Sequence, residues 1–361
     1  MNFTIPPYDL WEYLQNTSKT VVLYGMGNGA DKILAVCQRY DIPIGDFFAS
    51  DGFVRGHAFH GKTVLSYSAV KEKYGAENII VLLSFGSSLP SVLDTIRQVA
   101  SECELYAPDV PVCGDTLFTR DFYLAHKEEF SRAADLLADE ESICIFQHTL
   151  NYKISGRIDE LFLAESKKET VYTELLNAKN ITCAMDLGAY NGDTVRELLT
   201  YAPSLHTVYA MEPDRRNFRK LDDYANTVTD TLTIHRVQAA AWKENTVLTF
   251  GAEGNRNSGV CAKGQEAKVV SVEALAPDRF LNGANVDYIK YDVEGAEAEA
   301  LAGSIETIRR CRPSLLVSAY HRSEDMYALL LQIHEICPEY RLYLRRYPYV
   351  PAWDLNIIAT K

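Results

Sequence analysis

The N-terminal third of the chain alternates between short apolar runs and segments with helical periodicity. Three of the apolar runs are strand-like, at residues 21–24, 44–50 and 78–83. A glycine-rich turn at residues 25–30 follows the first run, and a helical pattern follows at residues 31–40. Apolar runs that alternate with amphipathic helices are typical of parallel strands with helices packed on both faces. The pattern therefore predicts a doubly wound, Rossmann-like α/β domain over residues 1–112.

Residues 113–170 have a different pattern, because helical periodicity dominates there. Helices are expected at residues 118–138 and 158–165, and the one strand-like run is a short apolar stretch at residues 143–146. This segment is predicted to be a helical connector or lid between two domains.

The C-terminal half repeats the order of strand, turn and helix. An apolar run at residues 181–187 leads into a turn at residues 188–194 and then into a helix. Six further strand-like runs follow, at residues 207–211, 233–238, 286–291, 314–320, 341–345 and 355–360. Seven strands that end in a hairpin fit a Rossmann-like sheet. The predicted fold class is α/β, with two Rossmann-like doubly wound domains, the second at residues 171–361.

The turn after the first strand of the second domain has ligand-binding character. Asp186, Gly188 and Gly192 stand where the strand ends and the helix begins, so small residues permit close backbone approach and helix N–H groups face a ligand. The next strand ends at Glu212, which can accept hydrogen bonds from both hydroxyls of an unphosphorylated ribose. These features equally suit NAD, and a plain strand-to-helix turn also remains open.

Carboxylates are concentrated at the end of the fourth strand. Asp292, Glu294 and Glu297 lie within the run at residues 289–297, beside Gly295. Ligands bind at the carboxyl ends of the strands in open α/β sheets, and core packing does not require such a group of acids. The run therefore indicates a functional site.

At this point the chain resembles the FkbM family of methyltransferases. The run at residues 289–297 matches the family's I-K-x-D-x-E-G-x-E pattern, and residues 186–194 are similar to its D-x-G-A-x-x-G-x-T turn. Residues 209–213 look like the family's acidic second-strand end, and the resemblance covers roughly residues 171–361. It implies a seven-stranded methyltransferase sheet and S-adenosylmethionine as the cofactor.

The resemblance also implies roles for particular residues. The methionine part of S-adenosylmethionine would be surrounded by the first turn, Glu212 would hold the ribose, and the end of the third strand would border the adenine. The predicted cofactor-binding residues are Asp186, Gly188, Ala189, Asn191, Gly192, Asp193, Glu212, Gln238 and Ala239. Trp242 could pack nearby, although a place in the core suits it better.

A hydroxyl acceptor needs a base, and two candidates stand at strand ends. His321 follows the fifth strand, and an ordinary histidine pKa suits proton abstraction near neutral pH. Asp292 is the rival catalytic residue, while Glu294 is expected either to bind acceptor hydroxyls or to cap the following helix. A divalent metal on Asp292, Glu294 and Glu297 is conceivable, but the spacing shows no further ligand set, so no metal is predicted.

The N-terminal domain carries a second glycine-rich turn. Gly25, Gly27 and Ala30 satisfy G-x-G-x-x-A between a strand and a helix, and Asp51 ends the next strand as a potential ribose acceptor. A nucleotide, a nucleotide sugar or no ligand all remain open. No catalytic group for hydride transfer can be named, because no Tyr-x-x-x-Lys pair follows at a useful spacing.

Composition narrows the classes of partner. A net charge of −13 and a pI near 5.1 would repel a phosphate backbone, so no nucleic-acid partner is expected. Eight scattered cysteines without a CxxC pair indicate free thiols in a reducing compartment. No apolar run approaches the roughly 20 residues of a membrane span, and the N-terminus does not resemble a signal peptide. A cytoplasmic location is predicted, while the oligomeric state is open.

Three functional hypotheses follow. The leading one is O-methylation of a sugar or other polar hydroxyl, with a small-molecule or glycan acceptor. The second is an NAD-dependent sugar-modifying oxidoreductase acting through the N-terminal domain, and the third is a non-catalytic binding module. The polar loop at residues 251–264 could close on an acceptor, although a hairpin turn suits it better.

Overall fold

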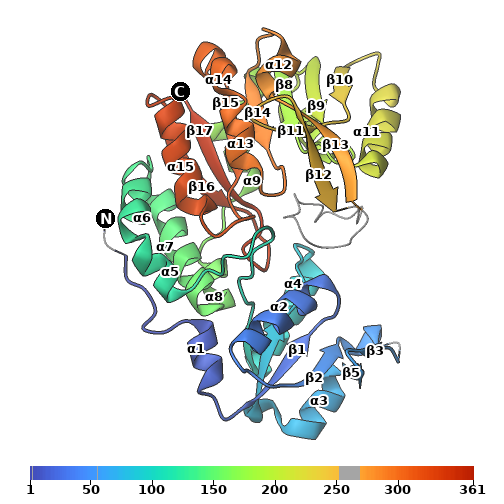
Figure 1. The fold of residues 1–361 in the computed structure, drawn as a ribbon, viewed down its shortest axis with the longest axis vertical. Helices are drawn as coiled ribbons and strands as arrows, with labels where there is room; N and C mark the ends of the chain where they lie inside the picture. The colour runs from blue at the N-terminus through green and yellow to red at the C-terminus, as the bar shows by residue number, and fades with distance from the viewer. Residues whose placement is uncertain (2, 55, 252–268) are drawn as a thin grey trace.

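The computed structural model describes residues 1, 3–54, 56–251 and 269–361, and Figure 1 shows their arrangement. Two sheets lie one above the other in this view, with a group of helices beside them. The α/β fold class predicted from the alternating pattern is confirmed by these two sheets. The loop at residues 251–264 lies outside the described residues except for Gly251.

The N-terminal sheet has five strands in the order β5-β2-β1-β6-β7, all paired in parallel. Its strands are β1 (Thr20–Tyr24), β2 (Ile44–Ala49), β5 (Leu65–Ser66), β6 (Ile79–Leu83) and β7 (Glu104–Tyr106). The helices of this unit are α1 (Leu10–Gln15), α2 (Asn28–Arg39), α3 (Tyr67–Tyr74) and α4 (Pro90–Glu102). A small hairpin is formed by β3 (Ala58–Phe59) and β4 (Lys62–Thr63).

The C-terminal sheet has seven strands in the order β10-β9-β8-β14-β15-β17-β16, as the apolar runs predict. The strands are β8 (Cys183–Leu187), β9 (Thr207–Met211), β10 (Thr233–Val237), β14 (Tyr288–Tyr291), β15 (Ser314–Ser318), β16 (Arg341–Arg346) and β17 (Leu355–Thr360). β17 is antiparallel to both its neighbours, and the other pairings are parallel. The helices are α10 (Asp193–Tyr201), α11 (Arg215–Thr227), α12 (Pro277–Leu281), α13 (Glu297–Ala302), α14 (Ile305–Cys311) and α15 (Asp325–Ile336).

A three-stranded sheet extends the C-terminal unit beside β10. Its order is β11-β13-β12, with bounds β11 (Ala240–Ala241), β12 (Thr246–Gly251) and β13 (Val269–Leu275). β11 begins shortly after the end of β10, whose carboxyl end lies at the carboxyl edge of the seven-stranded sheet because β10 is parallel to β9.

The central strands of the C-terminal sheet bring four segments to one edge. β8, β14 and β15 are almost entirely buried, because helices cover both faces of the sheet. Since these strands run parallel, the residues that follow each of them meet at the same edge. Gly188, Asp292 and the pair Tyr320 and His321 stand there, and Glu212 follows the neighbouring β9.

The segment between the two sheets is helical, as predicted, but two details differ from the sequence pattern. The helix expected at residues 118–138 is divided at His126. The strand-like run at residues 143–146 lies inside a helix, where Ile145 and Phe146 enter the core. The helices are α5 (Arg120–Ala125), α6 (Lys127–Asp135), α7 (Glu140–Ser155), α8 (Ile158–Phe162) and α9 (Lys168–Thr170). Among the described helices, none combines the length and apolar character needed to cross a membrane.

These connecting helices share a core with the C-terminal sheet. Phe130 of α6 and Phe146 of α7 are fully buried in the same cluster as Met326 of α15 and Leu342 of β16. Figure 1 shows α5, α6 and α7 beside β16 and α15. Because their apolar faces are buried against the sheet, they are a fixed part of that unit's core.

The two sheets face each other through their turns. Ser87, in the turn after β6, exchanges backbone hydrogen bonds of 2.9 and 3.1 Å with Val350, in the loop between β16 and β17. A Cβ atom on Gly86 would lie 2.6 Å from the Trp353 ring, so a glycine is needed for this approach. The N-terminal unit therefore contacts the C-terminal unit beside the edge where the central strands end.

Arg346 fastens the helical segment to the C-terminal sheet. Its side chain is fully buried at the end of β16, and it donates hydrogen bonds to the carbonyls of Leu161, Ala164, Tyr347 and Tyr349. Burial lowers the pKa of the guanidinium to about 10, so it stays charged near neutral pH. One cation thus satisfies carbonyl groups from α8, from the turn after it and from the loop after β16.

Replacing Arg346 by leucine should destabilise the protein by about 3 kcal/mol or more, because several buried carbonyl groups would lose their donor. Arg341→Leu, at the exposed first position of the same strand, should change the free energy of unfolding by less than about 0.5 kcal/mol. Chemical denaturation of both variants measures the difference. Equal effects would contradict the role assigned to Arg346.

Candidate functional site

A cavity of about 400 Å³ opens at the carboxyl edge of the C-terminal sheet. It extends along the edge from the end of β9, past β8 and β14, to the end of β15. Residues following each of these strands line it, namely Glu212, Gly188, Asp292 and Tyr320. The position agrees with the expectation that parallel α/β sheets bind ligands at this edge.

The glycine turn after β8 is shaped by contacts within the chain. Gly188 has φ +84°, and a Cβ atom there would lie 1.9 Å from the backbone oxygen of Asp292. Its N–H donates a 3.0 Å hydrogen bond to the Met211 carbonyl. Gly192 has φ +82°, and its Cβ would lie 2.5 Å from the Tyr224 ring. Both glycines were expected to admit a ligand, but the close approach that requires them is made by the protein itself.

The other residues predicted in this turn differ in their access to the cavity. Asp193, at the start of α10, lines it, whereas Ala189 is fully buried and donates its N–H to the Met211 carbonyl. Asn191 accepts a hydrogen bond of 3.2 Å from Arg196. Asn191 and Ala189 are not among the described residues that line the cavity.

Asp186 is a buried carboxylate within β8. No described residue donates a hydrogen bond to either of its oxygens, and burial raises its pKa to about 7, against the opposing effect of Lys290. Lys290 stands opposite Asp186 on β14, but its ammonium donates to Asp292 Oδ2 at 3.0 Å. Burial alone would lower the pKa of Lys290, yet Asp292 and Asp186 raise it above its ordinary value. Asp186 thus lies behind the cavity wall as a partner of this charge network.

Glu212 faces the cavity in a fixed orientation. Oε2 accepts the N–H of Tyr190 at 2.8 Å, and Oε1 accepts the N–H of Asp214 at 2.8 Å. The side chain is only 6% exposed, and burial raises its pKa to about 7, although both backbone hydrogen bonds lower it. Each carboxylate oxygen has a second lone pair that these bonds leave available.

The residues that line the cavity beyond the third strand differ from the predicted ones. Gln238 is exposed and Ala239 is fully buried, and neither is among the described residues that line the cavity. The next residues do line it: Ala240 and Ala241 of β11, and Trp242. The wall is therefore displaced by two residues from the prediction and lies at β11 and Trp242.

Three side chains donate hydrogen bonds to Asp292. Lys290 donates to Oδ2, and Ser318 Oγ and Tyr320 OH donate to Oδ1 at 3.0 and 3.3 Å. Burial opposes ionisation, but Lys290 and His321 outweigh it and lower the pKa of Asp292 to about 2. Asp292 lines the cavity as a carboxylate at neutral pH.

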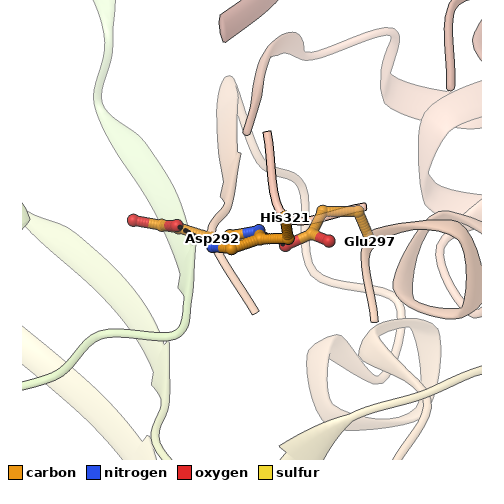
Figure 2. A group of neighbouring side chains, drawn as sticks. All are labelled: Asp292, Glu297 and His321. Atoms are coloured by element: carbon orange, nitrogen blue, oxygen red, sulfur yellow. Dashed lines mark ion pairs between the residues drawn. The ribbon is translucent and has the colours of Figure 1, made fainter. Parts of the chain in front are cut away.

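His321 lies directly behind this wall and is 1% exposed. Figure 2 shows its ring between Asp292 and Glu297: Nδ1 is 3.0 Å from Glu297 Oε1, and Nε2 is 3.7 Å from Asp292 Oδ1 and 3.6 Å from Glu294 Oε2. Burial lowers the pKa of His321, but these carboxylates raise it to about 10. The prediction of His321 as a base assumed an ordinary histidine pKa. That assumption is wrong for this geometry, because three carboxylates around the ring favour its charged form.

Glu294 and Glu297 lie on opposite sides of this histidine. Glu294 lines the cavity and has φ +54°, so it does not continue into the helix that follows. Glu297, at the start of α13, is 1% exposed and accepts the N–H of Val293 at 2.8 Å. Asp292, Glu297 and His321 offer possible metal-ligand atoms all within 4.8 Å of one another. Sequence spacing could not pair His321 with these acids, because it arrives from the next strand.

The far end of the cavity was not predicted from the sequence. Tyr349, Trp353 and Asp354, from the loop between β16 and β17, line it together with Ser88 and Val112 from the N-terminal part of the chain. The Tyr349 and Trp353 rings are 5.7 Å apart. The aromatic residues and prolines at 347–353 were a signal available in the sequence, whereas Ser88 and Val112 reach the site only through the contact between the two units.

The glycine turn of the N-terminal unit is filled by its own chain. A Cβ on Gly25 would lie 2.7 Å from the Phe85 ring, and one on Gly29 would lie 2.1 Å from the Ser84 carbonyl oxygen. Asp51 accepts the N–H of Ser68 at 3.1 Å, which is a local contact near the end of β2. These two glycines therefore serve strand and helix packing. A Cβ on Gly27, the other glycine of the motif, would meet nothing within 4 Å, and the NAD hypothesis stays a prediction.

The chain was compared with known proteins. Residues 186–351 match the family model described as the methyltransferase FkbM domain. Among solved structures, methyltransferase FkbM from Methylobacillus flagellatus KT aligns with a TM-score of 0.71 and 21% identity, covering 99% of this chain and 94% of that chain. Precorrin-6y C5,15-methyltransferase from Geobacter metallireducens GS-15 aligns at a TM-score of 0.35 and 12% identity, covering 55% and 93%. No curated protein matches the chain.

The fold and the domain match together define a methyltransferase. Residues 186–351 match the methyltransferase FkbM domain, so the predicted resemblance of this segment and the enzyme class, methyltransferase, are confirmed. The fold similarity to the Methylobacillus protein extends over nearly the whole chain, including the N-terminal sheet.

Gly188→Ala should destabilise the protein much more than Gly283→Ala. Both glycines have nearly the same positive φ, +84° and +83°, but a Cβ on Gly283 meets nothing within 4 Å. Backbone strain alone costs about 1–2 kcal/mol, which is the effect expected at Gly283. At Gly188 the clash with the Asp292 backbone adds to it, so the loss should be at least twice as large. Thermal and chemical unfolding of both variants test this, and similar losses would contradict it.

Proposed function

We propose that this methyltransferase transfers a methyl group from S-adenosylmethionine to a hydroxyl group of a sugar or another polar small molecule. The observation that carries the proposal is the fixed Glu212 carboxylate at the cavity wall. Two backbone N–H groups hold it so that one lone pair on each oxygen stays free. Two neighbouring ribose hydroxyls are the partner that such a pair of acceptors fits.

The residues around Glu212 suit an adenosyl group with an amino-acid tail. Ala240, Ala241 and Trp242 give one part of the cavity an apolar surface for a base, and Asp193 lies near the turn after β8 as a carboxylate for an ammonium group. An unphosphorylated ribose is favoured, because a phosphate beside Glu212 would meet a negative charge. Of the other predicted donor-binding residues, Asp186, Ala189, Gly192 and Ala239 shape the wall from behind.

When bound, S-adenosylmethionine supplies a methyl group already activated by a positively charged sulfur. The protein then has to hold the acceptor oxygen in line, and such positioning can account for about 7 kcal/mol or more of the barrier. Asp292 faces the cavity and can accept a hydrogen bond from the acceptor hydroxyl. As the O–CH₃ bond forms, the bond between sulfur and the methyl carbon breaks, its electron pair stays on the departing thioether, and the hydroxyl proton passes to the Asp292 carboxylate. We propose Asp292 and His321 as the catalytic residues, with Asp292 accepting the proton and the charged His321 ring stabilising Asp292 from behind.

The far end of the cavity suits a polar acceptor that has an apolar face. Tyr349 and Trp353 offer aromatic surfaces, while Glu294, Asp354 and Ser88 offer hydroxyl-binding oxygens. A pyranose ring has this combination of C–H faces and hydroxyl edges. Glu294 keeps its predicted role as an acceptor-binding residue in this proposal.

The affinity for S-adenosylhomocysteine should fall roughly ten- to hundredfold in Glu212→Gln, because hydrogen bonds to a charged acceptor contribute about 1.5–3 kcal/mol. Glu306→Gln, an exposed acid on α14, is the matched control and should bind as the original chain does. Isothermal titration calorimetry on the full chain measures both. Absence of binding by the unaltered chain, or equal binding by Glu212→Gln, would overturn the proposal.

Donor-product affinity should also decrease as the pH falls below about 7. The pKa of Glu212 is raised to about 7 without ligand, whereas ribose hydroxyls bind the carboxylate, so binding below that pH requires loss of a proton. The expected slope approaches tenfold in affinity per pH unit on the acidic side and flattens above neutrality. Calorimetry across this range should find that part of the slope missing in Glu212→Gln. An identical slope in both proteins would assign the dependence to another group.

A further inference from the structure

Acidic side chains predominate along the cavity wall. Glu197 and Asp354 are among the acids that line it, whereas the cationic side chains among the described residues of the wall are Lys168 and Lys290. Lys290 donates to Asp292 Oδ2 at 3.0 Å, so its charge is already used by a carboxylate of the protein. Lys168 is therefore the cation of the described wall that is available to an anionic group of a ligand.

The proposed donor carries both signs of charge in its amino-acid tail. This inference rests on the proposed function, which places S-adenosylmethionine in the cavity. The ammonium group of the tail suits a wall of carboxylates, but those acids repel the carboxylate of the tail. A carboxylate that leaves water also needs a cationic partner to offset its loss of hydration. The wall therefore has to supply a cation near the end of the tail.

Lys168 stands at the start of α9, and its ammonium group is held at the cavity by Glu197 of α10. Nζ lies 3.0 Å from Glu197 Oε1 and donates a hydrogen bond of 3.3 Å to Oε2. It also lies 4.9 Å from the centre of the Tyr347 ring. An ammonium group has three N–H donors, so binding to one carboxylate leaves donors for a second one.

The pair lies beside the turn where the amino-acid tail is expected. Glu197 follows Asp193 by four residues in α10, and residues at this spacing lie on the same face of a helix. Both acids line the cavity, and Asp193 is the carboxylate that the proposed function assigns to the ammonium group. Lys168 is thus placed where it can reach the carboxylate of the same tail.

The charge of Lys168 also acts across the cavity. Burial raises the pKa of Asp354, and the positive charge of Lys168 opposes that rise. Asp354 lies in the loop between β16 and β17, whereas Glu197 lies on α10. The ammonium group is therefore situated between two acidic parts of the wall and reduces the repulsion that a ligand carboxylate would meet there.

The backbone that carries Lys168 is fixed by the connecting helices. Ser166, two residues earlier, donates its N–H to the Arg346 carbonyl and its Oγ to Glu141 Oε1, both at 2.8 Å. Ser166 is buried, while the Lys168 side chain is 39% exposed. A fixed backbone and a held ammonium group reduce the conformational freedom that ligand binding would otherwise remove.

We propose that Lys168 binds the carboxylate of the donor's amino-acid tail, with Glu197 positioning its ammonium group, and so makes the affinity depend on an intact tail. Lys168 lies outside residues 186–351, the segment that matches the methyltransferase domain. The helical connector therefore supplies a specificity-determining residue to the donor site.

The experiment compares three nucleosides by isothermal titration calorimetry on the full chain. S-adenosylhomocysteine has the whole tail, its decarboxylated form lacks only the carboxylate, and 5′-methylthioadenosine lacks both charged groups. Lys168→Met should weaken binding of S-adenosylhomocysteine by about tenfold, because a charge-assisted contact is lost. The same variant should bind the decarboxylated form no more weakly than the unaltered chain does, and its affinity for 5′-methylthioadenosine should be unchanged.

The neighbouring lysine supplies the matched control. Lys167→Met removes the same charge from an exposed position that does not line the cavity, and it should leave all three affinities unchanged. Lys168→Arg should keep the preference for S-adenosylhomocysteine over its decarboxylated form, because a guanidinium group also binds carboxylates. Unchanged binding of 5′-methylthioadenosine shows that the Lys168→Met protein is folded.

The inference is overturned if Lys168→Met binds S-adenosylhomocysteine as tightly as Lys167→Met does. An equal loss for 5′-methylthioadenosine would also reject it, because Lys168 would then support the site without recognising the carboxylate. Equal affinities of the unaltered chain for S-adenosylhomocysteine and its decarboxylated form would reject it without any variant. These results leave the Glu212→Gln test standing, whereas binding of none of the three nucleosides would reject the proposed function and this inference together.

Discussion

The close approach of two strand ends sets the shape of the site. β8 and β14 are neighbours, and the chain leaves β8 through Gly188. Gly188 lies so near the Asp292 backbone that there is no room for a Cβ atom. This contact fixes where the turn after β8 begins and where Asp292 stands relative to it. Because the Gly188 and Ala189 N–H groups also bind the Met211 carbonyl, β9 is joined to the same arrangement. Glu212, one residue further on, receives its position from this packing.

Buried charge then determines the chemistry at that edge. His321 carries its charge in a buried setting and Asp292 carries its charge at the cavity wall, and each is stable there because groups of opposite sign surround it. Asp186 and Glu212 lack a cation close enough to balance their burial, and their pKa values rise toward neutrality. The same sheet edge thus holds ionised groups at the ends of β14 and β15 and groups with near-neutral pKa values at β8 and β9. The first set of groups keeps its charge near neutral pH, whereas the charge of the second set can change when a ligand binds.

The sequence predicted the parts of this arrangement that depend on strand order alone. Apolar runs located the strands, and the rule that parallel strands end at one edge brought Glu212, Asp292 and His321 together. The protonation of His321 could not be predicted, because it depends on carboxylates from separate segments. The real partner of Gly188 was hidden for the same reason, since the contact is with a backbone more than a hundred residues away. Trp353 and Ser88 were missed because each reaches the cavity only through the packing of two units.

The paired hydrogen bonds between Ser87 and Val350 have a consequence for how separable the two units are. The Trp353 ring packs against Gly86, and Ser88 lines the cavity itself, so the first Rossmann-like unit forms part of the cavity wall. A fragment that contains only residues 171–361 would keep every strand of the seven-stranded sheet. It would lack the helices that cover β16, and one side of the cavity would be open to solvent. The two units are separate in the sequence but depend on each other in the folded chain. The N-terminal unit forms part of the wall of the cavity in the C-terminal unit and so helps determine which molecules fit there.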